Sequence, residues 1–577
     1  MSDTFISRHE YHSMESEASQ MQDLSFPYEN LAPCKPKTST WFSSETGIYT
    51  SKHNPIKIPS DPFLDIVSFI FSHKHHGLSA LVDSPSGHSI SYTQLQELVK
   101  SMASGLHSIG ISQGHVVSIQ LPNTIYFPVI YLGVLSVGAI VTTMNPLSSF
   151  TEIQKQMADC NVVLAFTVSG CLEKLKRTGV RVVVIPESVE SDSNSSEFSC
   201  FNGLLSSNPE FAPTPIIRQK DTAALLYSSG TSGVSKGVII THANLIAAVE
   251  LFVRFEVSLY ENPGWENVYL AALPMFHVYG LSLFAMGLLS VGATVVVMRR
   301  FNADEMVRSI DRYRVTHIPV VPPIVTALME AKGRCSHVFG SLKQVSCGAA
   351  PLSKKTIEEF LQSFPHVDFI QGYGMTESTA VGTRGFNTKM IRKYTSVGLL
   401  APNMEAKVVD LNTRACLPPG KTGELWLRGP GIMKGYLNDA KATSSTIDED
   451  GWLHTGDVVH FDLDGFLYVL DRLKEMIKYK GFQVAPADLE AILISHPGIL
   501  DAAVIAAKVE EVGEIPVAFV VKKPGSVLSQ ADVIDYVSRL VSPHKKVRKV
   551  VFIHSIPRSA AGKILRKQLR NQGNARM

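Results

Sequence analysis

The chain of 577 residues has few cysteines and almost no excess charge. Its seven cysteines are scattered and none forms a C-x-x-C pair, which argues against a disulfide scaffold or a zinc site and fits a reducing compartment. The formal net charge is only +2, and the sequence contains no long basic run and no aromatic-interleaved basic stripe. The composition therefore gives no reason to expect a nucleic-acid partner.

Long uninterrupted apolar runs are also missing. Residues 114–151 and 268–298 carry no formal charge, but both are interrupted by prolines, glycines and polar side chains. We therefore expect buried α/β core there rather than a transmembrane span. Residues 1–44 contain no apolar segment of the kind that a secretory signal needs. We expect residues 1–40 to form a mobile N-terminal tail.

Most of the chain alternates between apolar strands and helical segments. The β-branched run at 182–185 (VVVI) is typical of a parallel strand that is buried on both faces. This alternation predicts an α/β fold with doubly wound subdomains over residues 41–395. Turn-rich sequence predicts a small β-rich subdomain at 396–470. A charged hinge at 471–475 then leads to a small α+β C-terminal domain at 476–577.

A loop of glycines, hydroxyls and one lysine stands between two apolar strands, at residues 228–237 (SSGTSGVSKG). Glycines let backbone N–H groups come close to a ligand, hydroxyls donate hydrogen bonds, and lysine adds a positive charge. The composition therefore predicts a polyphosphate loop. It is not a Walker A motif, because no hydroxyl directly follows Lys236. The alternative is a Ser/Gly linker, which the flanking apolar strands disfavour.

Four further motifs are each ambiguous when taken alone. Residues 371–377 (QGYGMTE) offer an aromatic face and a carboxylate for Mg²⁺, or they form an ordinary strand-to-helix turn. Asp457 could accept ribose hydroxyls or simply belong to a turn. The lysines at 474–480 are also typical of a solvated charged face, and Lys563 either reaches a phosphate or belongs to a basic helix.

In this order, SSGTSGVSKG, QGYGMTE, GWLHTGD, DRLKEMIKYKGFQVAP and PRSAAGKILRK resemble the adenylate-forming superfamily of acyl-CoA synthetases. The nearest resemblance is to the plant 4-coumarate–CoA ligase and ligase-like group, from about Trp41 to Lys567. It implies that a carboxylate attacks the α-phosphate of ATP, and that CoA then displaces AMP from the acyl adenylate. The first step needs no strong base, but it needs suppressed charge repulsion and in-line geometry. ATP, CoA and Mg²⁺ are the implied co-substrates and cofactor.

The resemblance also implies roles in the nucleotide site. Glu377 would hold Mg²⁺, and Lys563 would bridge the acid and the α-phosphate. The implied catalytic residues are Lys563, His277, Lys478 and Gln483. Those implied to bind ATP or AMP are Ser228, Ser229, Gly230, Thr231, Ser232, Lys236, Gln371, Gly372, Tyr373, Thr376, Asp457, Arg472 and Lys474.

Between the two steps the C-terminal domain is implied to rotate about the hinge. Lys563 would leave, and Lys480 and Gly481 would meet CoA, to which Arg300 is also implied to bind. His277 matches a histidine beside the acyl pocket, where it would gate the pocket or help the thiol to lose its proton; the alternative is an ordinary core histidine. The residues implied to line the acyl pocket are Tyr279, Leu283, Ser346, Ala349, Gly372, Ala380 and Val381.

Several positions depart from the hydroxycinnamate ligases. Residues 423–429 read GELWLRG instead of GEICIRG, residues 378–381 read STAV instead of AGPV, and Leu283 replaces a smaller polar residue. These changes favour an acid more apolar than 4-coumarate: a fatty acid, a cinnamate-type ring or an oxylipin side chain. Ser235 stands in place of a proline, which predicts a looser loop with retained activity.

Three alternative functions stay open at this point. They are a luciferase-like enzyme that does not use CoA, a true 4-coumarate–CoA ligase, and a non-enzymatic nucleotide-binding or membrane-associated protein. The last would leave Lys563 and Glu377 without a role.

The sequence ends in Ala575-Arg576-Met577. This small–basic–apolar tripeptide resembles the peroxisomal address whose type form is S-K-L. We expect it to bind the peroxisomal import receptor and to direct the protein to peroxisomes, with the cytoplasm as the alternative location.

Overall fold

The computed structural model describes residues 41–187, 195–228, 235–260, 263–388, 390–479, 482–509, 513–559 and 562–576. Of residues 336, 482, 483, 513 and 572–576 it describes the backbone only. The predicted tail at residues 1–40 lies outside the described residues.

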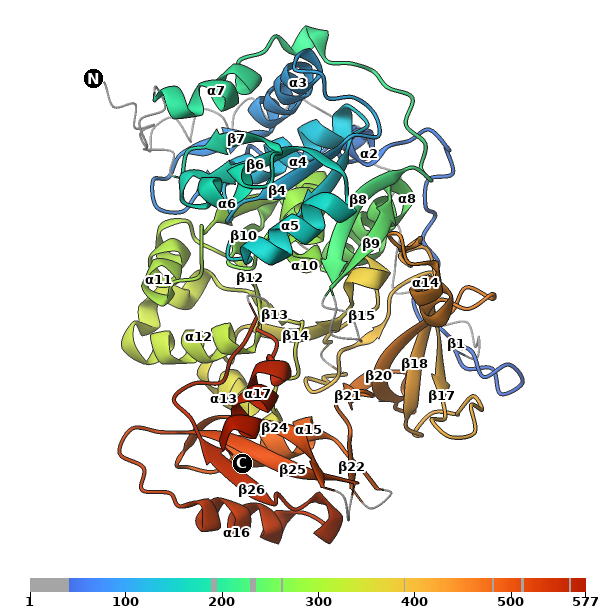
Figure 1. Cartoon of the computed structure of the whole chain (residues 1–577), viewed down its shortest axis with the longest axis vertical. Coiled ribbons are helices and arrows are strands. Elements are labelled where there is room, and N and C mark those ends of the chain that lie inside the picture. The colour runs from blue at the N-terminus through green and yellow to red at the C-terminus, as the bar shows by residue number, and fades with distance from the viewer. Residues whose placement is uncertain are drawn as a thin grey trace. The chain divides into compact units, whose positions relative to one another are not determined.

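Two large mixed sheets carry the first part of the chain (Figure 1). In the described residues, one sheet has parallel inner strands and antiparallel edges, in the order β16 (Leu399–Leu400), β15 (Thr383–Arg384), β14 (Asp368–Tyr373), β13 (Gln344–Cys347), β12 (His317–Val320), β10 (Val268–Ala271), β11 (Thr294–Val297), β2 (Ser79–Asp83) and β3 (Ser89–Ser91). The other runs β19 (Gly435–Tyr436), β9 (Lys236–Thr241), β8 (Thr222–Ser228), β5 (Ile140–Thr143), β4 (Val116–Gln120), β6 (Val162–Val168) and β7 (Arg181–Ile185). The predicted doubly wound α/β fold is confirmed.

Helices connect and cover these strands (Figure 1). They are α2 (Ile66–Ser72), α3 (Tyr92–Ser108), α4 (Tyr126–Ser136), α5 (Phe150–Asp159), α6 (Leu172–Lys176), α7 (Ser199–Leu205), α8 (His242–Ala248), α9 (Phe255–Ser258), α10 (Val278–Ser282), α11 (Ala303–Arg312), α12 (Pro322–Arg334) and α13 (Lys354–Ser363). Several begin at a capping box in which a hydroxyl and the side chain three residues later satisfy each other's backbone amides, as Ser91 and Gln94 do at α3.

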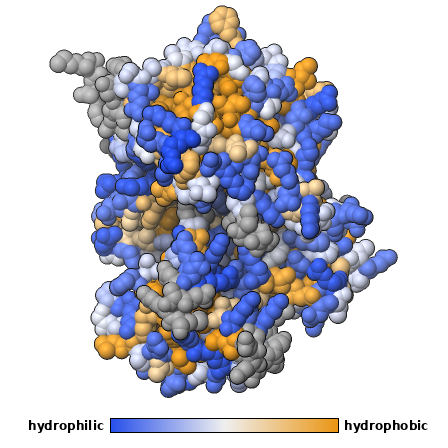
Figure 2. Space-filling model, viewed as in Figure 1, coloured by the Kyte–Doolittle hydropathy of each residue, from blue (hydrophilic) through white to orange (hydrophobic). Residues whose placement is uncertain are grey.

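The two uncharged stretches form buried core, as predicted. Residues 114–151 contain β4, α4 and β5, and the side chains of α4 from Phe127 to Leu135 are all buried. A helix that is apolar on every side has no face for water, so it packs between other elements. Among the described residues, no helix is both long and apolar enough to cross a membrane. Figure 2 shows a face on which hydrophilic residues predominate and hydrophobic ones form scattered patches.

A third, antiparallel sheet forms the β-rich part of the chain. Its order is β1 (Tyr49–Thr50), β17 (Glu405–Val409), β18 (Gly423–Arg428), β20 (Leu453–Phe461) and β21 (Leu467–Arg472), and α14 (Ala440–Thr446) precedes β20. The edge strand β1 comes from outside the predicted range of 396–470. It is anchored by Tyr49, whose buried ring stacks 4.5 Å from that of Phe461 and whose hydroxyl donates to the Leu417 carbonyl at 2.7 Å.

The C-terminal part has a sheet and a hydrophobic core of its own. The sheet contains β23 (Phe482–Val484), β22 (Ile477–Tyr479), β25 (Gly513–Lys522), β24 (Ile499–Val509) and β26 (Lys549–Phe552). The helices packed against it are α15 (Pro486–Ile494), α16 (Gln530–Leu540) and α17 (Arg566–Arg576) (Figure 1). The predicted small α+β C-terminal domain is therefore confirmed as a fold.

Candidate active site

The predicted phosphate loop connects the antiparallel strands β8 and β9. Ser228 lies opposite Lys236 in the strand register, so the loop leaves and re-enters the sheet at one point. The Ser235 hydroxyl donates to the Ser228 carbonyl at 3.1 Å, which ties the base of the loop together. Lys236 Nζ lies 4.8 Å from the centre of the Tyr436 ring. Ser229, Gly230, Thr231 and Ser232 lie outside the described residues.

Glu377 is a buried carboxylate that faces this loop. Ser228 Oγ donates to Glu377 Oε1 at 2.8 Å, and the Tyr436 hydroxyl donates to the same oxygen at 3.0 Å. In the described part of the chain no hydrogen bond reaches Oε2, and no group of three or more His, Cys, Asp or Glu side chains could hold a metal ion. A single free carboxylate oxygen suits Mg²⁺, which binds through one or two carboxylates and completes its shell with phosphate oxygens and water.

Asp457 lies at the centre of a second polar cluster. It is 3% exposed, accepts a hydrogen bond of 2.6 Å from the Tyr373 hydroxyl, and pairs with Arg472 at 3.2 Å between Oδ1 and Nε. Burial and Asp457 both raise the pKa of Tyr373 well above its usual value, and Asp457 raises that of Arg472. The Tyr373 hydroxyl and Arg472 thus hold the carboxylate in one orientation, as a group that accepts two hydroxyls must be held.

Lys563 approaches both carboxylates from the C-terminal domain. A Cβ placed on the preceding Gly562 would lie 3.2 Å from Val321, at the start of α12, so this turn is packed against the N-terminal part. Burial and Arg472 lower the pKa of Lys563 to about 8, against the attraction of Asp457 and Glu377. Lys563 is therefore still mainly a cation at neutral pH. Lys563 thus interacts with Glu377 and Asp457, the two carboxylates that the resemblance implies bind Mg²⁺ and the ribose.

His277 lies close to Lys563 and is neutral. Burial, with Lys563, lowers its pKa to about 4. Its Nδ1 accepts the backbone N–H of Tyr279 at 3.4 Å, at the start of α10, so in the neutral ring Nε2 carries the proton. A weakly basic imidazole with its free nitrogen already protonated is better suited to closing a pocket than to removing a proton from a thiol.

The residues implied to contact the acyl group surround one region. They lie on α10 and the π-helical segment Leu283–Gly287 that follows it, on or just after β13, on β14 and in the turn after Glu377. A Cβ on Gly348 would lie 3.3 Å from the Tyr279 ring and 3.6 Å from the Gly372 carbonyl, so these elements converge. Leu283, Ser346 and Val381 are buried, whereas the partly exposed members are Tyr279, Ala349, Gly372 and Ala380.

Other residues of the implied nucleotide set lie around these clusters. The Gln371 side-chain amide donates to the Tyr394 carbonyl at 2.7 Å, and Thr376 is buried next to Glu377. Lys474 follows Arg472, and burial and Arg472 lower its pKa.

Some implied site residues lie away from this cluster or cannot be placed. Lys478 on β22 and Arg300 after β11 are exposed. Lys480, Gly481 and Met577 lie outside the described residues, and only the backbone of Gln483, Ala575 and Arg576 is described.

Two buried contacts were missed by the sequence analysis. Tyr436 belongs to no recognisable motif, and only its hydrogen bond to Glu377 reveals it. Arg384 on β15 forms an ion pair with Glu256 on α9, and both side chains are 7% exposed. The only sequence signal was the presence of charge in otherwise core-forming segments.

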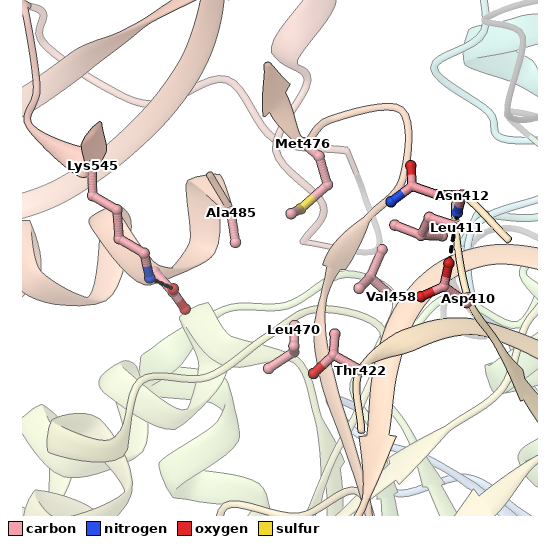
Figure 3. Close-up of a pocket in the computed structure, with 10 residues that line it drawn as sticks. Asp410, Leu411, Asn412, Thr422, Val458, Leu470, Met476, Ala485 and Lys545 are labelled. Atoms are coloured by element: carbon pink, nitrogen blue, oxygen red, sulfur yellow. Dashed lines mark hydrogen bonds and ion pairs between the residues drawn. The ribbon is translucent and has the colours of Figure 1, made fainter. Parts of the chain in front are cut away.

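Two cavities flank these clusters. One of about 590 Å³ lies beside the phosphate loop and is lined in part by Lys236, Tyr227 and Asp439. The other, of about 330 Å³, lies between the β-rich sheet and α15 (Figure 3). Its charged groups already have partners, since Lys545 pairs with Asp488 at 2.8 Å and Asp410 accepts the Asn412 backbone N–H at 2.9 Å. We therefore assign no ligand to the second cavity.

Comparison with known proteins agrees with the motifs. Residues 71–437 match the family described as AMP-binding enzyme, and residues 488–563 match the AMP-binding enzyme C-terminal domain. The chain is 60% identical to 4-coumarate--CoA ligase-like 6 of Arabidopsis thaliana, over 93% of this chain and 97% of that one. It is 44% identical to Peroxisomal OPC-8:0-CoA ligase 1 of Arabidopsis thaliana, over 92% and 96% of the two chains.

Comparison with a solved structure supports the same assignment of the fold. ATP-bound MatB from Rhodopseudomonas palustris superimposes with a TM-score of 0.80 at 25% identity, covering 88% of this chain and 98% of that one. The chain therefore belongs to the AMP-binding enzyme family and is an AMP-forming acyl-CoA synthetase, an acid–CoA ligase that works through an adenylate.

Proposed function

We propose that the protein uses ATP and Mg²⁺ to adenylate an apolar aryl-propenoic, fatty or oxylipin acid and then transfers the acyl group to CoA. The observation that carries the proposal is the convergence of Lys563, Glu377 and Asp457, which come from distant parts of the chain. A lysine cation between a nucleotide site and an acyl site is what two reacting anions require.

In the first step, a carboxylate oxygen of the acid bonds to the α-phosphorus of ATP while the bond to pyrophosphate breaks. Lys563 would lie between the two anions, Asp457 and Arg472 would hold the ribose, and the phosphate loop with Lys236 would hold the β- and γ-phosphates. Glu377 would hold Mg²⁺, which neutralises charge on the phosphates when it is bound. These groups mainly fix geometry and screen charge.

In the second step, the thiolate of CoA bonds to the acyl carbon and the bond to AMP breaks. This step has no pair of anions for Lys563 to screen. We propose that Arg300, Lys480 and Gly481 contact CoA. We propose that the C-terminal domain rearranges about residues 471–475 between the two steps, so that Lys563 leaves and these residues reach CoA.

The acid is proposed from the residues around Tyr279. Leu283 and Val381 are buried and apolar, and Ala349 and Ala380 are small, which suits an apolar ring or chain. The relative whose name includes OPC-8:0-CoA ligase is a further reason to test oxylipin acids.

Product formation from a panel of acids tests this function. Purified protein with ATP and Mg²⁺ is given cinnamates, benzoate, medium and long fatty acids and oxylipin acids, each with and without CoA. We expect pyrophosphate release and acyl-CoA formation with an apolar acid, and loss of both in Lys563→Ala. Steady AMP release without CoA would instead favour a luciferase-like enzyme. A marked preference for 4-coumarate would contradict the role given to Leu283, and failure with every acid would refute the proposed activity.

We also propose that the peroxisomal import receptor binds Ala575-Arg576-Met577, in line with the peroxisomal relative. A fluorescent protein fused to the N-terminus should co-localise with a peroxisomal marker, and removal of the last three residues should leave it diffuse in the cytoplasm. A truncated fusion that still enters peroxisomes would refute the role of the tripeptide.

A further inference from the structure

Arg384 introduces a fixed positive charge beside the apolar acyl region. Its partner across β14 is Gly372, one of the residues implied to contact the acyl group. Because glycine has no side chain, the Arg384 side chain can fold over that position, and a Cβ on Gly372 would lie only 2.7 Å from Arg384 Nη1. The guanidinium thus lies against the backbone that is implied to line the acyl site.

Glu256 and Phe252 hold the guanidinium in place. Glu256 forms an ion pair with Arg384 Nε, and the Phe252 ring lies 4.9 Å from the guanidinium carbon. The two residues are four apart on the π-helical segment Val249–Arg254 and α9, so one helix face supplies both contacts. Burial alone would lower the pKa of Arg384, but Glu256 and Tyr279 raise it above its usual value.

The polar groups here are not fully satisfied. The Tyr279 hydroxyl is close enough to Arg384 and Ser346 to be influenced by both, yet it completes no hydrogen bond of normal geometry. The buried Ser282 hydroxyl on α10 also has no partner. A guanidinium carries five N–H donors, and Glu256 is the one carboxylate paired with it in the described part of the chain. Donors therefore remain at the Tyr279 side of the guanidinium.

Tyr279 connects the Arg384–Glu256 ion pair with the groups that are proposed to react. His277 accepts the backbone N–H of Tyr279 and lies near Lys563, where the carboxylate of the acid would react. Arg384 lies near the hydroxyl end of the same residue and against Gly372, and the centre of the Phe252 ring lies 6.1 Å from that of the Tyr279 ring. An acyl group that extends along Tyr279 from the reacting end would meet Arg384 with its tail.

We propose that Arg384, positioned by Glu256, donates a hydrogen bond to an oxygen atom at the tail of the acyl group. This inference rests on the proposed function and narrows it: the preferred acid has an apolar chain that ends in a hydroxyl or carbonyl oxygen. A site built to hydrogen-bond such an oxygen rejects the analogue that lacks it, because the buried donors are then left unpaired.

Matched pairs of acids test the inference. Decanoate is compared with its ω-hydroxy counterpart, and dodecanoate with its ω-oxo counterpart, in pyrophosphate release with purified full-length protein. We expect kcat/KM to favour the oxygenated member by at least about 10-fold. In Arg384→Met the oxygenated acid should lose that advantage, mainly through a higher KM, while the unsubstituted acid is unaffected or improved.

Removing one partner of a buried ion pair can destabilise the fold, so a second variant is needed. Arg384→Met combined with Glu256→Gln removes both charges and should show the same loss of preference at a normal unfolding temperature. Arg384→Lys keeps the charge but not the fork of donors, and should restore only part of the preference.

The outcomes separate this inference from the proposed function. Pyrophosphate release at equal rates with both members of each pair would overturn the role of Arg384 and leave the ligase activity intact. A preference that survives in the double variant would also overturn it. Failure to release pyrophosphate with any acid would refute the ligase activity and this inference together.

Discussion

Replacing Lys563 by alanine is expected to lower the rate of adenylate formation by about 10²- to 10³-fold, the cost of losing one preorganised charge-stabilising donor. Lys563 is attracted by both Glu377 and Asp457, and it lies near His277. Without it, the acid and the α-phosphate repel each other at the moment of attack. Pyrophosphate release under single-turnover conditions measures the loss.

The second half of the reaction gives a sharper test of the same residue. Acyl-CoA formation from a supplied acyl adenylate should stay within about threefold of the wild-type rate, since that step has no anion pair for Lys563 to screen. Lys567→Ala, which removes an exposed lysine four residues further on, is the matched control and should leave both steps intact. Equal losses in the two steps would contradict a role confined to adenylation.

The pKa of Lys563 predicts that the rate of adenylation falls at high pH. Because that pKa is lowered to about 8, the side chain loses its charge as the pH rises through 8, well before an ordinary lysine would. The wild-type rate of pyrophosphate release should therefore fall above about pH 8, and this fall should be absent from the residual activity of Lys563→Ala.

Replacing Glu377 by glutamine is expected to lower the rate of adenylation by about 100-fold and to raise the Mg²⁺ concentration needed for half-maximal activity. The amide oxygen can still accept the two hydrogen bonds that Ser228 and Tyr436 donate to Oε1. We therefore expect the local fold to be unchanged. What is lost is the negative charge at Oε2. A Mg²⁺ titration of pyrophosphate release provides the measurement.

Tyr436→Phe tests how much the hydrogen bond from Tyr436 to Glu377 contributes, apart from the charge of Glu377. It removes one donor to Glu377 and leaves the carboxylate group in place, so we expect a loss of only a few-fold, in line with the net worth of one hydrogen bond of about 1 kcal/mol. If Glu377→Gln kept the Mg²⁺ dependence of the wild type, Glu377 would not be the metal ligand.

The sequence predicted what depends on local pattern and missed what depends on distant contacts. The strand β7 and the α/β core at residues 114–151, which contains β4, α4 and β5, were predicted because β-branched and apolar runs are visible within a few residues. β1 was not predicted, since two residues carry no period and their partners lie on β17. The same holds for the site: Glu377 and Asp457 stand in motifs, but Tyr436 and the Arg384–Glu256 pair become visible only in three dimensions.

The pairing of β1 with β17 also bears on how the chain assembles during synthesis. Tyr49 leaves the ribosome early, but Leu417, which accepts its hydroxyl, follows 368 residues later. At about 5 to 20 residues per second, the ring of Tyr49 waits roughly 20 to 70 s for its partners. Nascent chains arrested before Leu417 should therefore expose this segment to proteases, although the strands around it in the sequence have already formed. The segment around Tyr49 is thus expected to be among the last parts of the chain to become protected from proteases.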